Sequence, residues 1–192
     1  MSSAAILPVY GMMLGELALT YGVFAKAPLV SFKYSLIVYF VLSIALILIM
    51  GFVPMPPAMK IALFTVFAVI QGLLLQSLRG VVSHDVIDKS IKGVIGIFLG
   101  MSLVAFALTS SGVDLGFLGP YMLGALIALI VALLIFKDRK IIAIFGLVLF
   151  SLYITYDTNL ILLRKMSAID GAVSLYLDTL NIFMDLLSLQ QN

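Results

Sequence analysis

Of the 192 residues, 64% are hydrophobic and only 10% are charged, whereas a soluble domain is about 45–50% apolar and about 25% charged. A soluble surface cannot be made from this composition, so the sequence predicts an integral membrane protein. The net charge of +2 is small, no basic run indicates nucleic-acid binding, and the lack of cysteine excludes disulfides and thiolate metal sites.

A transmembrane helix needs about 20 mostly apolar residues, and a long span in lipid must be helical because its backbone has no other hydrogen-bond partners. In chain order, the expected helices are Ile6–Val23, Tyr34–Met50, Met59–Leu78, Ile91–Leu108, Phe117–Phe136, Ile141–Leu162 and Gly171–Leu189. The first lacks the basic start of a cleavable signal peptide, so we expect it to remain as a span. The sequence therefore predicts an all-α membrane protein, a seven-transmembrane-helix bundle that forms one domain over residues 1–192.

Two connectors stand out along the chain. Pro54, Pro56 and Pro57 are expected to separate the second and third helices, because proline lacks the helical N–H donor and clashes with the preceding turn. The polar residues 79–89, which read RGVVSHDVIDK, are expected to link the third and fourth spans. This would place His84, the single histidine, in a solvated connector.

Two pairs of glycines have the spacing of close helix contacts. Gly11 and Gly15 lie in the first span, and Gly96 and Gly100 lie in the fourth. Small residues four apart let transmembrane helices approach closely, so we expect both pairs to lie at helix–helix contacts.

The basic residues predict a membrane orientation. With seven spans, the connectors after the first, third and fifth lie on the same side of the membrane as the C-terminus. The positive-inside rule places the side with more Lys and Arg in the cytosol. That side holds Lys26, Lys33, Arg79, Lys89, Lys92, Lys137, Arg139 and Lys140, and the other side holds Lys60, Arg164 and Lys165. The count therefore places the C-terminus in the cytosol and the N-terminus outside.

The last expected helix carries a polar stripe. Its members follow one another at helical spacing and share one face: Ser174, Asp178, Asn181, Asp185 and Ser188. One interpretation is an amphipathic helix lying in the membrane interface, but such helices favour Lys and Arg on the polar face, and this face is acidic. We favour a helix inside the bundle whose stripe lines a hydrated path and attracts cations.

A second acid, Asp157, lies near the end of the sixth expected helix. The short connector MSAIDG makes the sixth and seventh helices antiparallel neighbours, and Asp157 and Asp178 are each one to two turns from it. The two carboxyls are therefore expected to face each other at similar depth. Arg164 is seven residues after Asp157, so it is a candidate ion-pair partner on the same face.

Two carboxylates a few Å apart in a low dielectric resist both being ionised and share one proton. A protonated pair ties the two helices together by a hydrogen bond. Deprotonation leaves repulsion, or a site for a hard cation such as Ca²⁺, which prefers oxygen ligands. The residues thus suggest a pH-gated cation path, with Asp157 and Asp178 as sensor and transient Ca²⁺ ligands. Glu16 in the first helix is either a further acid lining the path or a neutral, protonated residue.

The closing segments resemble a known family. Residues 151–162 read SLYITYDTNLIL and residues 174–189 read SLYLDTLNIFMDLLSL, which is similar to the closing signature of the Bax inhibitor-1 (transmembrane Bax inhibitor motif) family. Weaker likeness runs through residues 113–119, VDLGFLG, and residues 9–24, VYGMMLGELALTYGVF. The resemblance implies seven helices with a central last helix, a Ca²⁺ leak sensitive to pH, and, in eukaryotic members, suppression of cell death. The family's paired aspartates fall on Asp157 and Asp178.

The sequence departs from the family in two respects. Some members carry an arginine at the end of the second helix that latches onto the acidic pair, whereas residues 46–60 here contain no arginine and Lys60 is the nearest cation. Family members also generally place the N-terminus inside, which is opposite to the charge count. Protease access to residues 83–89 in sealed vesicles would decide the orientation.

Other classes remain open or are disfavoured. An intramembrane serine protease needs a base, and the only histidine, His84, is expected in a connector. A retinal protein needs a lysine in the last helix, and this helix has none. We therefore expect no enzyme and no cofactor. A proton-coupled transporter of small solutes is an alternative, as is a non-conducting cell-death regulator that acts by interaction. The expected partners are the bilayer, Ca²⁺, protons and, in a eukaryotic or viral setting, cell-death regulators. A bacterial inner membrane and an organelle membrane are not distinguished.

Overall fold

The computed structural model describes residues 6–28 and 33–191. For residues 33–35 it describes the backbone only. Within the described residues the elements are α1 (Ile6–Lys26), α2 (Lys33–Phe52), α3 (Pro57–Leu75), the 3₁₀ turn η2 (Gln76–Gly80), α4 (His84–Ser110), the 3₁₀ turn η3 (Gly116–Leu118), α5 (Gly119–Ile135), α6 (Arg139–Leu162) and α7 (Ala168–Gln190). The seven predicted helices are confirmed. The side chain of Lys33, used in the charge count, lies outside this description.

Six of these helices are long and apolar enough to cross a membrane, and α2 adds a shorter apolar stretch over Leu36–Phe52. The proline connector also forms as expected: α3 starts at Pro57, the first helical position, where the missing N–H of proline costs nothing.

The start of α4 differs from the prediction. It begins at His84, well before Ile91, so His84 is a helix residue and the expected connector is wrong in its second half. Two exposed ion pairs at helical spacing support this polar first part, Asp85 with Lys89 at 2.7 Å and Asp88 with Lys92 at 2.8 Å. Hydropathy alone missed it because a helix can begin before its apolar span does.

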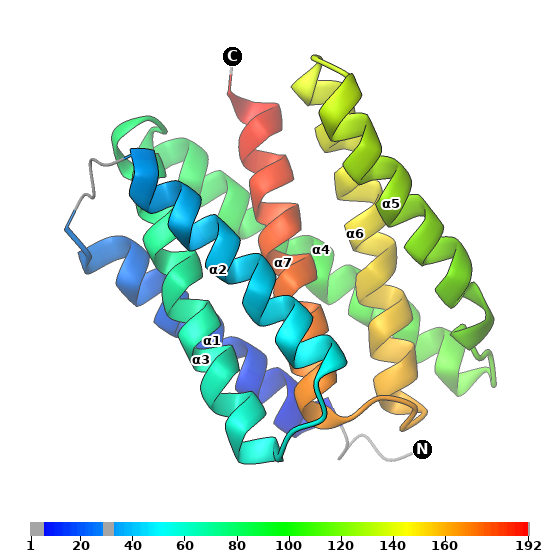
Figure 1. Ribbon diagram of the computed structural model, residues 1–192. Helices are drawn as coiled ribbons and strands as arrows, with labels where there is room; N and C mark the ends of the chain where they lie inside the picture. Colours follow the sequence, from blue (N-terminus) through cyan, green and yellow to red (C-terminus); the bar gives the residue numbers. More distant parts are fainter. Residues whose placement is uncertain (1–5, 29–32, 192) are drawn as a thin grey trace. The chain divides into compact units, whose positions relative to one another are not determined.

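The chain forms two compact units, residues 1–9 with 84–192, and residues 10–83. In the first unit α7 packs against α6 and α4, and α6 also packs against α4 and α5. Figure 1 shows α6 and α7 running side by side, joined by a short connector. In the second unit α3 packs against α2, and Thr20 of α1 donates a hydrogen bond to the Ala68 carbonyl of α3 at 3.0 Å.

Within its unit, α7 is the buried helix. Most of its apolar side chains are buried or half-buried, with Leu175, Tyr176 and Ile182 all 0% exposed. In contrast, Met122 is the one buried residue of α5, whose other apolar side chains are available to lipid. A helix whose apolar face is buried in protein does not lie on the membrane surface, so the interfacial interpretation of α7 is wrong.

The glycine pairs do not mark the close helix contacts. A Cβ placed at Gly11, Gly15, Gly96 or Gly100 meets no atom within 4 Å. The spacing of small residues shows that two helices can approach, but it does not show which face meets a neighbour. The close approaches occur at other glycines instead, which are Gly72, Gly93, Gly119, Gly146 and Gly171.

Candidate functional site

Asp157 lies in the buried end of α6. Almost every residue from Ile154 to Leu162 is buried, and Asp157 itself is 4% exposed. Thr155 donates a hydrogen bond to the Met101 carbonyl of α4 at 3.1 Å, which ties this part of α6 to α4. A carboxylate buried in such surroundings needs either a partner or a proton, because its desolvation is otherwise costly.

Asp178 of α7 supplies that partner. It is 5% exposed, and its carboxyl and that of Asp157 are placed for a hydrogen bond with each other. The Ser174 hydroxyl is placed to donate to Asp157. A hydrogen bond between two carboxyl groups requires a proton on one of them. The structure thus brings together the two residues, called here the aspartate pair, as the register of α6 and α7 predicted.

One oxygen of the pair is left over. Oδ2 of Asp178 is buried and has no hydrogen-bond partner. Among the residues that the structure describes, no three His, Cys, Asp or Glu side chains come together as metal ligands. Ca²⁺ takes 6–8 oxygen ligands, of which the pair supplies only its carboxylates.

Asp185 lies further along the same face of α7, opposite a glycine of α6. A Cβ at Gly146 would lie 2.9 Å from Cγ of Asp185, so only glycine leaves room for this carboxyl. Oδ2 of Asp185 is buried without a partner. The stripe of α7 therefore faces α6 at three of its members, Ser174, Asp178 and Asp185, while Asn181 is half-buried.

Two predicted site residues lie elsewhere. Glu16 belongs to the other unit, where its Oε1 accepts a hydrogen bond from Thr65 of α3 at 2.6 Å and its Oε2 is buried without a partner. Arg164 is exposed and follows the end of α6, with φ of 57°. The expected pairing of Arg164 with Asp157 is wrong, because α6 ends at Leu162 and helical spacing no longer applies beyond it.

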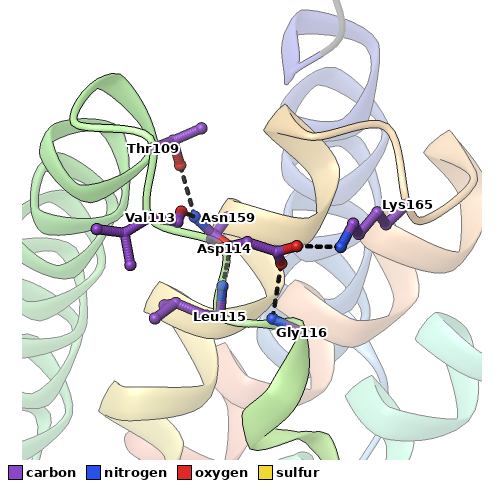
Figure 2. Close-up of polar contacts among 7 residues, drawn as sticks. All are labelled: Thr109, Val113, Asp114, Leu115, Gly116, Asn159 and Lys165. Atoms are coloured by element: carbon purple, nitrogen blue, oxygen red, sulfur yellow. Dashed lines mark hydrogen bonds and ion pairs between the residues drawn. The ribbon is translucent and has the colours of Figure 1, made fainter.

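Sequence reasoning missed Asn159, which is 0% exposed. Its amide nitrogen donates to the Thr109 hydroxyl at 2.7 Å and to the Val113 carbonyl at 2.9 Å, and its oxygen accepts from the Leu115 N–H at 2.9 Å. Figure 2 shows Asn159 reaching from α6 to the connection between α4 and α5. We call these four residues the Asn159 clamp. The available signal was an amide within an apolar span, which requires partners.

An ion pair lies beside the clamp. Lys165 contacts the Asp114 carboxylate, which also accepts a hydrogen bond from the Gly116 N–H at 2.9 Å (Figure 2). Both side chains are exposed, outside the spans. The hydrogen bond from Lys165 and then that from Gly116 lower the pKa of Asp114 below its ordinary value of 3.8.

We expect Lys165→Met to raise the pKa of Asp114 toward 3.8, because the largest cause of its lowering is removed. A lowered pKa means that the ionised carboxylate stabilises this connection at neutral pH, and that the contribution is lost only as pH falls through the lowered value. The measurement is an NMR titration of the Asp114 carboxyl carbon. Arg164→Met is the matched control, since it removes a neighbouring exposed cation; an equal shift there would contradict a specific role of Lys165.

The chain is similar to known proteins over most of its length. The family described as "Inhibitor of apoptosis-promoting Bax1" matches residues 3–192 of the chain. The chain belongs to the Bax inhibitor family. A Helicobacter pylori protein is 35% identical over 164 residues, which are 79% of this chain and 70% of the relative. Protein LIFEGUARD 2 of Arabidopsis thaliana is 36% identical over 116 residues, which are 56% of this chain and 48% of the relative.

A further relative is protein LIFEGUARD 4 of Arabidopsis thaliana, 38% identical over 102 residues, which are 48% of this chain and 41% of the relative. The match to the family over residues 3–192 and the apolar helices of this chain make it an integral, multi-pass membrane protein of the Bax inhibitor family. At the level of the family, the role is regulation of cell death, and the family is not known for enzymes.

Proposed function

We propose that this Bax inhibitor family member is a pH-sensitive cation leak with Ca²⁺ as permeant ion, gated by the aspartate pair. Through this leak it would act in calcium homeostasis and in the suppression of cell death. The observation that carries the proposal is the burial of two facing carboxyls, Asp157 and Asp178, on adjacent helices, with one oxygen of Asp178 unpartnered.

The gating step follows from the proton that the pair shares. While the proton is present, the hydrogen bond holds α6 and α7 together. The aspartate pair then carries a net charge of only about −1, which attracts a cation weakly. When the proton leaves, two carboxylates repel each other across the helix interface. The helices separate or a cation enters to neutralise the charge. Flux is therefore expected to rise as pH rises through the titration of the pair.

The stripe of α7 supplies the proposed path beyond the pair. Ser174 lies beside Asp157, and Asn181 and Asp185 follow Asp178 on the same face of α7. Asp178 and Asp185 are seven residues apart, which is about 10 Å along a helix. A cation that leaves the pair would thus meet a third carboxylate, that of Asp185, before the end of α7. Acidic side chains at membrane depth typically line such ion pathways.

The experiment measures Ca²⁺ release from proteoliposomes against pH with a Ca²⁺-sensitive dye. Wild-type protein is expected to show a pH-dependent flux, and Asp157→Asn and Asp178→Asn are each expected to abolish the pH dependence. Asp88→Asn is the matched control, because Asp88 is an exposed acid of α4 that pairs with Lys92. An unchanged pH response in both pair variants would overturn the proposal.

The same assay separates the two alternatives. A proton-coupled transporter would pass protons only when its solute is added, whereas a leak passes cations without a solute. A non-conducting regulator would show no flux in any variant, and its effect on cell death would survive the loss of both aspartates.

A further inference from the structure

We infer that Asn159 is a positioning residue for the aspartate pair: its clamp on the α4–α5 connection holds the last turns of α6 in the rotation that points Asp157 at Asp178. This inference rests on the proposed function.

The clamp is fully satisfied. Both hydrogens of the Asn159 amide are used, on Thr109 and Val113, and its oxygen accepts from the backbone of Leu115. Thr109 is free to accept because its own hydroxyl hydrogen goes to the Ala105 carbonyl at 2.7 Å. These contacts also determine which end of the amide is nitrogen, since a flipped amide would set oxygen against two acceptors. A buried side chain held at three points has one orientation.

The partner backbone is itself held in place. Gly112 ends α4 with φ of 79°, a value that favours glycine, and the Val113 N–H bonds back to the Leu108 carbonyl at 2.9 Å. This turn offers the Val113 carbonyl to Asn159. On the other side, the Lys165 N–H bonds to the Leu160 carbonyl at 2.9 Å, which closes the end of α6. Asn159 thus joins two well-defined helix ends.

The geometry of α6 relates the clamp to the pair. Residues two apart on an α-helix point to nearly opposite sides, since each residue turns the chain by about 100°. Asp157 points to α7, and Asn159 points to the α4–α5 connection. Any rotation of the last turns of α6 that moves Asp157 away from Asp178 must therefore break the clamp or drag the connection with it.

Few other groups act on the pair directly. The titratable side chains that interact with it are the phenols of Tyr153 and Tyr156 on α6, which are uncharged below about pH 10. α7 adds the Ser174 hydroxyl. Among the described residues, no cation and no further acid of α4 or α5 acts on either aspartate. The pH at which the pair opens therefore depends on the burial of the two carboxyls and on how firmly they are held together.

The test compares the pH midpoint of Ca²⁺ flux in wild type and Asn159→Ala. Without the clamp Asp157 is free to turn away, so the proton of the pair is held less firmly and flux begins at lower pH. We expect the midpoint to fall by about one pH unit, equivalent to about 1.4 kcal/mol. Thr109→Val removes one contact and is expected to give a smaller shift in the same direction. Ser111→Ala is the matched control, because the Ser111 hydroxyl, directly after α4, donates to the Ala107 carbonyl of α4 at 3.0 Å and takes no part in the clamp.

A merely structural role predicts a different pattern. Asn159→Ala would then lower the melting temperature and leave the midpoint where it is, and this outcome overturns the inference. Should Asn159→Ala fail to fold, Thr109→Val decides on the same readout. A pH response that survives in Asp157→Asn and Asp178→Asn overturns the proposed function as a whole. A response lost in those variants but unshifted in Asn159→Ala overturns this inference alone.

Discussion

Gly72→Ala is expected to lower the free energy of unfolding of the residue 10–83 unit by about 3 kcal/mol, the upper range for overpacking a close contact. A Cβ at this position of α3 would lie 2.6 Å from the Val23 Cβ and 2.7 Å from the Thr20 carbonyl oxygen of α1. Neither atom can rotate away, because one is fixed by its backbone and the other is backbone. The two helices must therefore separate, which also weakens the hydrogen bond from Thr20 to Ala68.

Far-ultraviolet circular dichroism during thermal unfolding in detergent is the measurement. Gly96→Ala and Gly100→Ala are the matched controls, since a Cβ at either position meets no atom within 4 Å. Alanine is a better helix former than glycine by about 1 kcal/mol, so the controls are expected to melt at or slightly above the wild-type temperature. A Gly72→Ala protein that melts with the controls would show that α1 and α3 do not approach this closely.

Gly146→Ala is expected to cost about 1–3 kcal/mol of stability, because its Cβ would displace the Asp185 carboxyl from the α6–α7 interface. Unlike the contact at Gly72, this one involves the end of a side chain. Removing that end should therefore relieve the strain. In a Gly146→Ala/Asp185→Ala double variant, we expect most of the lost stability to return, with a coupling of about 0.5–3 kcal/mol between the two sites.

The double-mutant cycle is measured by the same thermal unfolding. Gly124→Ala in α5 is a suitable control, because nothing lies within 4 Å of a Cβ there. Additive effects of Gly146→Ala and Asp185→Ala would contradict the contact. They would also remove the evidence that the stripe of α7 faces α6 at this depth, which the proposed ion path requires.

The aspartate pair was accessible to sequence reasoning because its geometry is local. Two helices joined by a short connector must run antiparallel, and the distance of Asp157 and Asp178 from that connector sets their depth. Helical spacing then placed the polar residues of α7 on one face. The Arg164 prediction used the same spacing and was wrong, because helical spacing was applied beyond Leu162, where both the expected helix and α6 end.

The Asn159 clamp was not accessible in this way. An amide in an apolar span signals that a partner exists, but Thr109 and Leu115 are 50 and 44 residues away in the chain. Nothing in the local pattern of α6 specifies which distant backbone groups it meets. The glycine pairs show the same limit, since Gly72 and Gly146 lie at close approaches while Gly96 and Gly100 do not.

The amino-acid sequence by itself determined the membrane location, the helical class, the number of helices and the shared face of the acids, because each follows from composition or from the period of one helix. Only the tertiary structure decided which glycines meet a neighbouring helix, where α4 begins, and what Asn159 binds. Those properties depend on the rotation of each helix against its neighbours, and that rotation is set by long-range packing.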